Sequence, residues 1–354
     1  MLNVKIERRH ELKEKPDMNN LGFGKYYTDH MFMLDWYRDK GFVNPRIIPY
    51  GPIEFDPAAL VLHYAQETFE GMKAYKTEDG RILLFRPEMN AKRFQSSNQR
   101  LCMPQLPVED FIQAVNDLVK YEADWIPNLP GTSLYIRPYM FAYQAKLGVH
   151  DADHYKFMVI LSPVGAYYKE GLKPVKIYVE DKYVRAVIGG TGFTKCGGNY
   201  AASILAQMEA EKKGYTQVLW LDGVHHKYVE EVGTMNAMFV IDGKIVTAPL
   251  EGSVLPGVTR DSMIHLLKSK GYTVEERHLS IDELIDAAKS GKLTEAFGTG
   301  TAAVISPIGV LAYKDEVFFN NNQIGPISQM LYDTLTGIQT GKLPDEFGWT
   351  YEVK

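Results

Sequence analysis

Three Asp–Gly pairs, at 79–80, 222–223 and 242–243, each follow an apolar run and most constrain what this chain can fold into. Glycine adopts the positive φ of a tight turn without strain, so each pair predicts a turn between two strands. The run AMFVIDGKIVTAP around the third pair is the clearest hairpin. Both halves of the chain are therefore expected to contain antiparallel strands.

Helical patterns lie between these strands. Pro87 opens the segment EMNAKRFQSSNQRL, since proline favours the first helical turn. Apolar residues at helical spacing predict a second helix over 107–123. Further helices are expected over GGNYAASILAQMEAEKKG, closed by Gly214, and over 259–270 and 280–290. A doubly wound nucleotide fold needs regular strand–helix alternation and a Gly-rich first turn, and neither occurs.

The run GAYYKEGLKPVK combines Gly, Pro and Lys and is the best linker candidate, over 165–176. We therefore predict an N-terminal α+β domain over 1–164 and a C-terminal domain over 177–354. A chain of 354 residues with 45% hydrophobic residues is long and apolar enough for two such domains.

Composition excludes several classes of protein. The net charge of −5 argues against nucleic acid as a partner, since phosphate binding needs a basic face. The two cysteines, Cys102 and Cys196, cannot form a disulfide framework, and no CxxC pair predicts a metal site. The charged N-terminus and the lack of a long apolar stretch predict a cytoplasmic protein without a membrane segment.

Lys195 lies between glycine clusters at 189–192 and 197–198, directly before a predicted helix. Glycines let a backbone approach a ligand closely, and a lysine amine in a confined site becomes nucleophilic toward an aldehyde. By itself this segment also fits a solvated loop lysine. Glu230 and Glu231 leave a similar choice: on a strand they point to opposite faces, so one can face inward or both can face solvent.

Two further segments suit an anion. LPGVTR leads into a helix, so the N–H groups near Val258 and Thr259 can bind phosphate, although Thr259 also fits a plain N-cap. The loop FGTGTAA presents Thr299 and Thr301 in a small-residue setting. In the N-terminal half, Arg86 and the Tyr135/Arg137 pair precede prolines, and arginine is well shaped for phosphate or carboxylate.

Taken together, these segments resemble a known family. FEGMKAY, LFRPEMNAKR, SLYIRP, KCGGNY, QVLWLDG, EVGTMN, LPGVTR and FGTGTAA stand in the order seen in branched-chain amino acid aminotransferases. These are class IV enzymes with the D-amino-acid-aminotransferase-like fold, fold type IV of pyridoxal-phosphate enzymes. The resemblance covers about residues 20 to 345. It implies two α+β domains with pyridoxal 5'-phosphate between them.

The resemblance also implies roles for single residues. Lys195 corresponds to the catalytic lysine that forms the Schiff base with the cofactor. Glu231 corresponds to the partner of the pyridinium nitrogen, and Tyr200 to the tyrosine on the phenolic oxygen. The phosphate is expected at Arg86, Val258, Thr259 and Thr299. The substrate is expected at Tyr64, Phe69, Tyr135, Arg137, Tyr167, Thr234, Thr301 and Ala302, with Arg185 at a site position of no assigned role.

The implied reaction transfers the amino group of L-leucine, L-isoleucine or L-valine to 2-oxoglutarate by ping-pong kinetics, within a homodimer. The alternatives in the same superfamily are D-amino-acid aminotransferase and aminodeoxychorismate lyase. From other classes, a cofactor-free Schiff-base lyase and a non-catalytic binding protein remain open. Mammalian members carry a redox CxxC whose positions are here Ala303 and Ser306, so we expect no thiol switch there.

Overall fold

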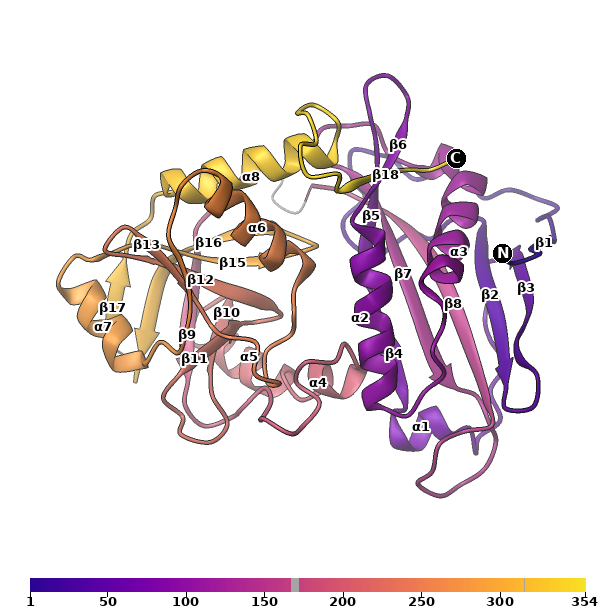
Figure 1. Cartoon of the computed structure of the whole chain (residues 1–354), viewed down its shortest axis with the longest axis horizontal. Coiled ribbons are helices and arrows are strands. Elements are labelled where there is room, and N and C mark those ends of the chain that lie inside the picture. Colours follow the sequence, from indigo (N-terminus) through magenta and orange to yellow (C-terminus); the bar gives the residue numbers. More distant parts are fainter. Residues whose placement is uncertain (167–171, 315) are drawn as a thin grey trace. The chain divides into compact units, whose positions relative to one another are not determined.

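The computed structural model describes residues 1–166, 172–314 and 316–354. Its contacts divide the chain into two compact units (Figure 1). Unit 1 comprises Met1–Lys169, Thr194–Gly197 and Gly337–Lys354, and unit 2 comprises Glu170–Phe193 and Gly198–Thr336. Each unit contains its own sheet and helices, so the expectation of two α+β domains is confirmed.

The division differs from the predicted boundaries at both ends of the second domain. The predicted linker 165–176 spans the change of unit, and its residues 167–171 lie outside the described part of the chain. The C-terminal segment 337–354 belongs to unit 1, because β18 (Thr350–Glu352) pairs antiparallel with β6 (Ile82–Phe85). A pairing between segments so far apart in sequence leaves no local signal, and the prediction was wrong there.

Unit 1 is built on a nine-stranded sheet in the order β1-β3-β2-β8-β7-β5-β6-β18, with β4 pairing β7. The other strands are β1 (Lys5–Ile6), β2 (His30–Tyr37), β3 (Gly41–Pro49), β4 (Glu67–Phe69), β5 (Met72–Lys76), β7 (Ser133–Ala142) and β8 (His154–Val164). Its helices are α1 (Leu60–Tyr64), α2 (Pro87–Arg100), α3 (Val108–Tyr121) and the short 3-10 helix Ala123–Trp125.

The core of unit 1 lies where α2 and α3 pack on this sheet (Figure 1). Phe94 of α2, Phe111 of α3 and Phe157 of β8 form a triangle of rings with centroids 5.5–5.8 Å apart. All three side chains are at most 1% exposed. Burial of a phenylalanine contributes about 1.5–3 kcal/mol, so this triangle fixes α2 against the sheet.

Unit 2 is built on a second nine-stranded sheet, in the order β11-β10-β9-β16-β15-β12-β13-β14, with β17 pairing β16. Strand β11 also pairs with β12, so the six strands β11, β10, β9, β16, β15 and β12 form a closed barrel. The strands are β9 (Val175–Glu180), β10 (Gln217–Leu221), β11 (Val229–Val232), β12 (Met235–Ile241), β13 (Lys244–Thr247), β14 (Val274–Glu276), β15 (Leu293–Gly300), β16 (Val304–Tyr313) and β17 (Glu316–Asn320).

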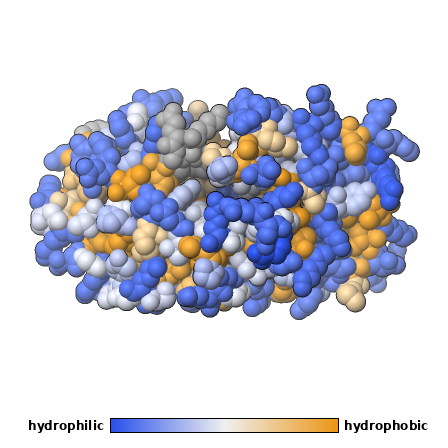
Figure 2. Space-filling view, turned by 90° about the horizontal axis from the view of Figure 1, so that it is seen from above, coloured by the Kyte–Doolittle hydropathy of each residue, from blue (hydrophilic) through white to orange (hydrophobic). Residues whose placement is uncertain are grey.

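The remaining helices are α4 (Gly197–Ala201), α5 (Ile204–Lys212), α6 (Val258–Ser269), α7 (Ile281–Lys289) and α8 (Pro326–Gln339). Helix α7 packs on the sheet of unit 2 through Leu284, which joins Phe239 and Leu311 in one buried cluster. Figure 2 shows hydrophilic side chains spread over one face of the molecule, with smaller hydrophobic areas between them.

Most predicted local elements are confirmed. Gly80 and Gly243 have positive φ in the β5–β6 and β12–β13 hairpins. Helices α2, α3, α6 and α7 lie where the pattern placed them.

Three local predictions were wrong. The predicted helix before Gly214 is two helices, α4 and α5. The run VKIYVEDKYVRAVIGG has the pattern of a strand throughout, but β9 ends at Glu180. It ends there because the Glu180 carboxylate accepts the N–H groups of Lys182 and Tyr183 and bends the chain. Asp222 similarly accepts four backbone N–H groups, so the 222–223 turn is a longer loop.

The described residues contain neither a membrane-spanning helix nor a metal-binding cluster of side chains. None of the helices combines the length and apolarity needed to cross a membrane. Within the same residues, no three His, Cys, Asp or Glu side chains lie where they could hold a metal ion.

The Ser280 hydroxyl caps α7 by accepting the N–H of Glu283 at 3.1 Å. Ser280→Ala leaves that N–H without its partner, so we expect the free energy of unfolding to fall by about 1 kcal/mol in urea denaturation. Ser290→Ala, at the other end of α7, is the matched control and should change it by less than about 0.5 kcal/mol. Equal effects of the two substitutions would contradict a capping role.

Candidate active site

Lys195 is held by its backbone within unit 1. Its N–H donates to the Oγ of Ser97 on α2 at 3.0 Å, and its carbonyl accepts the N–H of Phe69 on β4 at 2.9 Å. The neighbouring Gly197 N–H donates to the Glu67 carboxylate. A Cβ on Gly197 would overlap that carboxylate, so any other residue would require the Glu67 side chain to move. The glycine-rich segment around the lysine is thus fixed to a helix and a strand.

The amine of Lys195 lies 4.8 Å from the centroid of the Phe69 ring. Burial, followed by the positive charge of Arg93, lowers the pKa of Lys195 to about 8, against the opposing effect of the Glu70 carboxylate. Glu70 is fully buried and holds Arg93 by two contacts, at 2.8 and 2.7 Å. A lowered pKa leaves more of the amine neutral near pH 8, which is the nucleophilic form.

Arg137 completes this cluster. Its guanidinium lies 4.7 Å from the Phe69 centroid, and its Nη2 donates to the Tyr135 hydroxyl at 2.9 Å. Its Nε is buried without a hydrogen-bond partner among the described residues. A Cβ on Gly71 would overlap the Tyr135 hydroxyl, so glycine at this position lets the tyrosine pack. Unit 1 therefore gathers Lys195, Phe69 and the Tyr135/Arg137 pair, although the predicted boundaries had placed Lys195 in the C-terminal domain.

Glu231 is the centre of a second cluster, in unit 2. It is 3% exposed, and its Oε1 accepts the Asn236 amide at 3.0 Å and the Leu255 N–H at 2.9 Å. Its Oε2 lies 2.9 Å from the Nε of Arg185. These donors and the arginine stabilise the charged carboxylate. Arg185, which the sequence left without a role, is thus the ion-pair partner of Glu231.

A small cavity of unit 2 joins Glu231 to other predicted residues. It is lined by Arg185, Asn199, Tyr200, Ser203, Glu231, Gly233, Thr234 and Leu255. The structure therefore brings Tyr200 and Thr234 to the same cavity as the carboxylate.

The N-terminus of α6 lies beside this cluster. Gly257 precedes the helix, no side chain of the described residues caps it, and a Cβ on Gly257 would overlap Asn236. Val258 and Thr259 are its first helical residues and are buried, so Thr259 is not the N-cap. Thr299 pairs with Asn236 across the sheet, and its buried hydroxyl has no partner among the described residues. Helix N–H groups and an unpaired hydroxyl suit a phosphate.

The comparisons with known proteins agree with this geometry. The family model "Amino-transferase class IV" matches residues 67–310. Branched-chain-amino-acid aminotransferase 2 of Bacillus subtilis (strain 168) is 57% identical over 351 residues, which cover 99% of this chain and 97% of that protein. The chain belongs to the branched-chain-amino-acid aminotransferases of class IV.

Solved structures of this family share the fold. The branched-chain amino acid aminotransferase of Escherichia coli superposes with a TM-score of 0.74 at 26% identity, over 91% of this chain and 99% of that one. The branched-chain amino acid aminotransferase from Thermobaculum terrenum, in its PLP form, also gives a TM-score of 0.74 at 26% identity, over 91% of this chain and 98% of that one.

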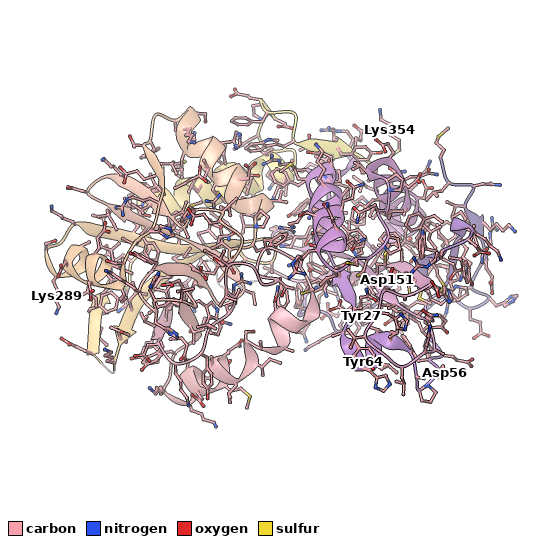
Figure 3. All side chains as sticks on the ribbon, turned by 60° about the horizontal axis from the view of Figure 1, so that its bottom comes forward. Tyr27, Asp56, Tyr64, Asp151, Lys289 and Lys354 are labelled. Atoms are coloured by element: carbon pink, nitrogen blue, oxygen red, sulfur yellow. The ribbon has the colours of Figure 1, made fainter. Side chains whose placement is uncertain are left out.

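The other predicted residues of this aminotransferase have contacts of their own. Arg86 precedes α2 with a positive φ of 48°, and its guanidinium stacks 5.0 Å from the Trp349 ring centroid. Tyr64 is 39% exposed on unit 1 (Figure 3), and its hydroxyl accepts the Gly148 N–H. The predicted Tyr167 lies outside the described residues. Thr301 and Ala302 are in the half-buried turn between β15 and β16.

Sequence reasoning missed several neighbours of these clusters. Phe23 packs edge-on against Tyr135, with ring centroids 4.9 Å apart. Lys73 is opposite Tyr135 in the sheet, and burial lowers its pKa to about 8. The Glu70–Arg93 ion pair and Asn236 were also missed. Glu70 and Lys73 lie in FEGMKAY, Arg93 ends LFRPEMNAKR and Asn236 ends EVGTMN, so these motifs offered a signal. The packing of Phe23 on Tyr135 depends on a long-range contact and left none.

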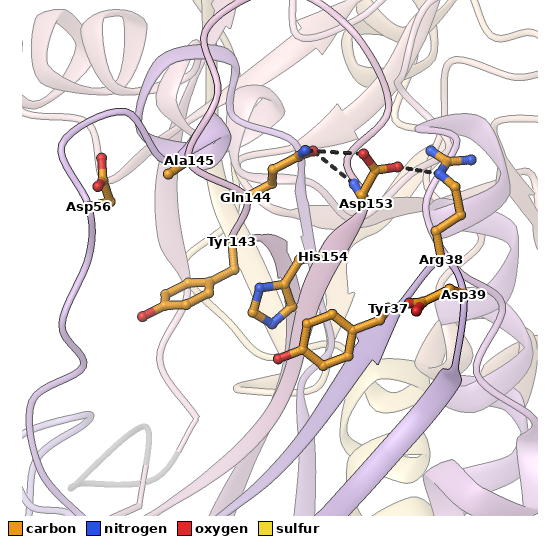
Figure 4. A pocket seen from close by; sticks show the side chains of 9 residues that line it. All are labelled: Tyr37, Arg38, Asp39, Asp56, Tyr143, Gln144, Ala145, Asp153 and His154. Atoms are coloured by element: carbon orange, nitrogen blue, oxygen red, sulfur yellow. Dashed lines mark hydrogen bonds and ion pairs between the residues drawn. The ribbon is translucent and has the colours of Figure 1, made fainter.

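A larger hollow of unit 1, about 680 Å³, contains none of the predicted residues (Figure 4). In it, His154 stacks on Tyr37 with centroids 4.3 Å apart and lies edge-on to Tyr143. Arg38 is paired with Asp153 at its rim.

The lowered pKa of Lys195 is testable without any substrate. Near pH 8 about half of its amines should be neutral, against less than about 1% for an ordinary lysine of pKa 10.4. In cofactor-free protein, we expect the rate of reductive methylation at Lys195 to rise with pH, with a midpoint near pH 8. Peptide mapping measures the modification of Lys195 separately from that of Lys73. A lysine-containing peptide is the control, and a midpoint above about 10 at Lys195 would contradict the prediction.

Proposed function

We propose that this aminotransferase transfers the amino group of L-leucine, L-isoleucine or L-valine to 2-oxoglutarate, with pyridoxal 5'-phosphate as cofactor and Lys195 as its attachment point. The observation that carries the proposal is the amine of Lys195, fixed by Ser97 and Phe69 and given a lowered pKa. The similarity to branched-chain-amino-acid aminotransferase 2 of Bacillus subtilis supports the substrate class, and the Thermobaculum terrenum structure in its PLP form supports the cofactor.

The residues present fit this cofactor. A phosphate is suited to the N-terminus of α6 at Val258 and Thr259 and to the orphaned Thr299 hydroxyl. The Glu231 carboxylate suits a protonated ring nitrogen, and Tyr200 lines the same cavity. We assign Arg86 to the phosphate on the family resemblance. When bound, pyridoxal phosphate supplies an electron-accepting ring that stabilises negative charge on the substrate α-carbon.

Lys195 and Glu231 would have different roles in proton transfer. Neutral Lys195 would accept the proton from the substrate α-carbon and deliver it to the C4′ carbon of the cofactor, and would move a proton the opposite way in the second half-reaction. Its lowered pKa of about 8 favours this role. Arg185, Asn236 and the Leu255 N–H stabilise the charged form of Glu231, which would keep a proton on the ring nitrogen of the cofactor. An amino group retained on the enzyme between the two substrates gives ping-pong kinetics.

Substrate recognition must accommodate both an apolar side chain and the charged one of glutamate. The Phe69 ring offers an apolar wall, and Tyr135 is its neighbour in the cluster. The buried Nε of Arg137 lacks a partner among the described residues and can donate to a carboxylate. We assign the remaining substrate contacts, Thr234, Thr301, Ala302, Tyr64 and Tyr167, on the family resemblance.

We also propose that the active form is a homodimer. Leu62, Leu147 and Val149 are apolar and 57–88% exposed on unit 1, and Tyr64 contacts the same region through Gly148. Covering such side chains stabilises an assembly. Their exposure supports a second copy as the cover.

Removing the Lys195 amine removes both the attachment point and the proton carrier. We expect Lys195→Ala to lower kcat with leucine and 2-oxoglutarate by at least about a thousandfold. Borohydride treatment followed by peptide mapping should place the cofactor on Lys195 in the unchanged protein. Lys289→Ala, at the exposed end of α7 (Figure 3), is the control and should retain full activity. An active Lys195→Ala enzyme would overturn the mechanism.

Arg137→Ala tests how glutamate is recognised. Loss of a hydrogen bond to a charged group costs about 1.5–3 kcal/mol, so we expect kcat/KM for glutamate to fall roughly tenfold to a hundredfold more than for leucine. Tyr135→Phe, which keeps the ring and removes the hydroxyl, is the comparison. If leucine and glutamate turnover fall equally in Arg137→Ala, the arginine does not select for glutamate.

A further inference from the structure

Unit 2 contains another cavity, of about 150 Å³, that includes none of the residues assigned to the reaction. Its buried lining is formed by Val229, Glu230, Ala248, Ser253 and Val254, each at most 8% exposed. Three of these side chains are apolar valine or alanine, and one is a carboxylate. A cavity with apolar walls and a few buried polar groups is typical of a small-molecule site.

Glu230 is the unusual member of this lining. Its Oε1 accepts the hydroxyl of Ser253, but its Oε2 is buried without a hydrogen-bond partner among the described residues. A buried polar atom left unsatisfied costs about 1–3 kcal/mol. Burial raises the pKa of Glu230, and a cation beside the carboxylate would offset that penalty. The Oε2 of Glu230 can therefore accept a hydrogen bond from a ligand, and a positively charged donor fits best.

The outer part of the cavity is apolar and acidic. Ile188 and Val224 contribute exposed aliphatic side chains. His278 lies 3.1 Å from Glu251, and His225 also lines the cavity. With Asp222 also in the lining, carboxylates outnumber groups that can carry positive charge, and the local field attracts cations.

We propose that this cavity binds a small aliphatic primary ammonium compound, its ammonium group donating to Glu230 and its hydrocarbon part packing on Val229 and Val254. A metal ion is not the fitting cation, because no cluster of metal-binding side chains occurs among the described residues. The volume equals that of about five water molecules, which suits a compound with a short branched chain.

The cavity is connected to Glu231. Glu230 and Glu231 are neighbours on β11 and have separate partners, so they serve opposite faces of the strand. Ser253 links the two: its hydroxyl donates to Glu230, and its carbonyl accepts from Arg185, the ion-pair partner of Glu231. A ligand on Glu230 would therefore also change the surroundings of that ion pair.

The test uses methyl NMR and calorimetry of the full-length protein after borohydride treatment, which prevents amines from reacting at Lys195. We expect isoamylammonium chloride to bind and to shift the methyl signals of Val229 and Val254. Glu230→Gln should weaken binding at least tenfold, whereas Glu251→Gln at the exposed rim should change it less than about threefold. The carboxylate 4-methylpentanoate, with a similar hydrocarbon chain, should leave both valines unshifted.

L-Leucine distinguishes the source of the ammonium group. Shifts of Val229 and Val254 with leucine identify an amino acid as the ligand, and shifts with isoamylammonium alone identify a simple amine. Absence of shifts with both compounds would overturn the proposal, and so would equal binding to Glu230→Gln. The valine shifts in the unchanged protein decide the question even if that variant fails to fold. Because these measurements need no turnover, they are independent of the proposed function.

Discussion

The buried ion pair between Glu70 and Arg93 underlies the arrangement of unit 1. It joins the segment after β4 to α2 with no exposure at the glutamate, and breaking such a pair leaves an uncompensated buried charge worth about 3–5 kcal/mol. Helix α2 also provides Ser97, which holds the backbone of Lys195. The same arginine lowers the pKa of that lysine. The backbone position of Lys195 and part of its pKa shift thus depend on the helix that this ion pair holds.

In unit 2, hydrogen bonds and an ion pair stabilise the charge of the buried Glu231 carboxylate. Glu231 receives two hydrogen bonds and an arginine, and Asn236 connects it to the start of α6 and to Thr299. Its neighbour Glu230 receives only the Ser253 hydroxyl. Adjacent positions of one short strand therefore carry two buried glutamates with different hydrogen-bond partners.

Local sequence signals predicted the parts of the fold that local physics decides. The Asp79–Gly80 and Asp242–Gly243 hairpins formed because glycine accepts positive φ, and Ser280 capped its helix. Where a side chain took over backbone hydrogen bonds, as at Glu180 and Asp222, the local pattern gave the wrong element. The nine-stranded order of each sheet, and the return of β18 to β6, depend on contacts that no local pattern contains.

The sequence by itself determined which chemistry the chain can support: a lysine among glycines, a glutamate before Val-Gly-Thr-Met-Asn, and a helix start after Leu-Pro-Gly. It could not determine whether Lys195 was reactive or merely solvated, because a pKa depends on burial and on charges brought from other segments. Tertiary structure buried the Lys195 amine near Phe69 and Arg93 and so lowered its pKa. It also brought Arg185 to Glu231 as an ion-pair partner. It also buried Glu230, a residue whose sequence position predicted nothing beyond a choice of face.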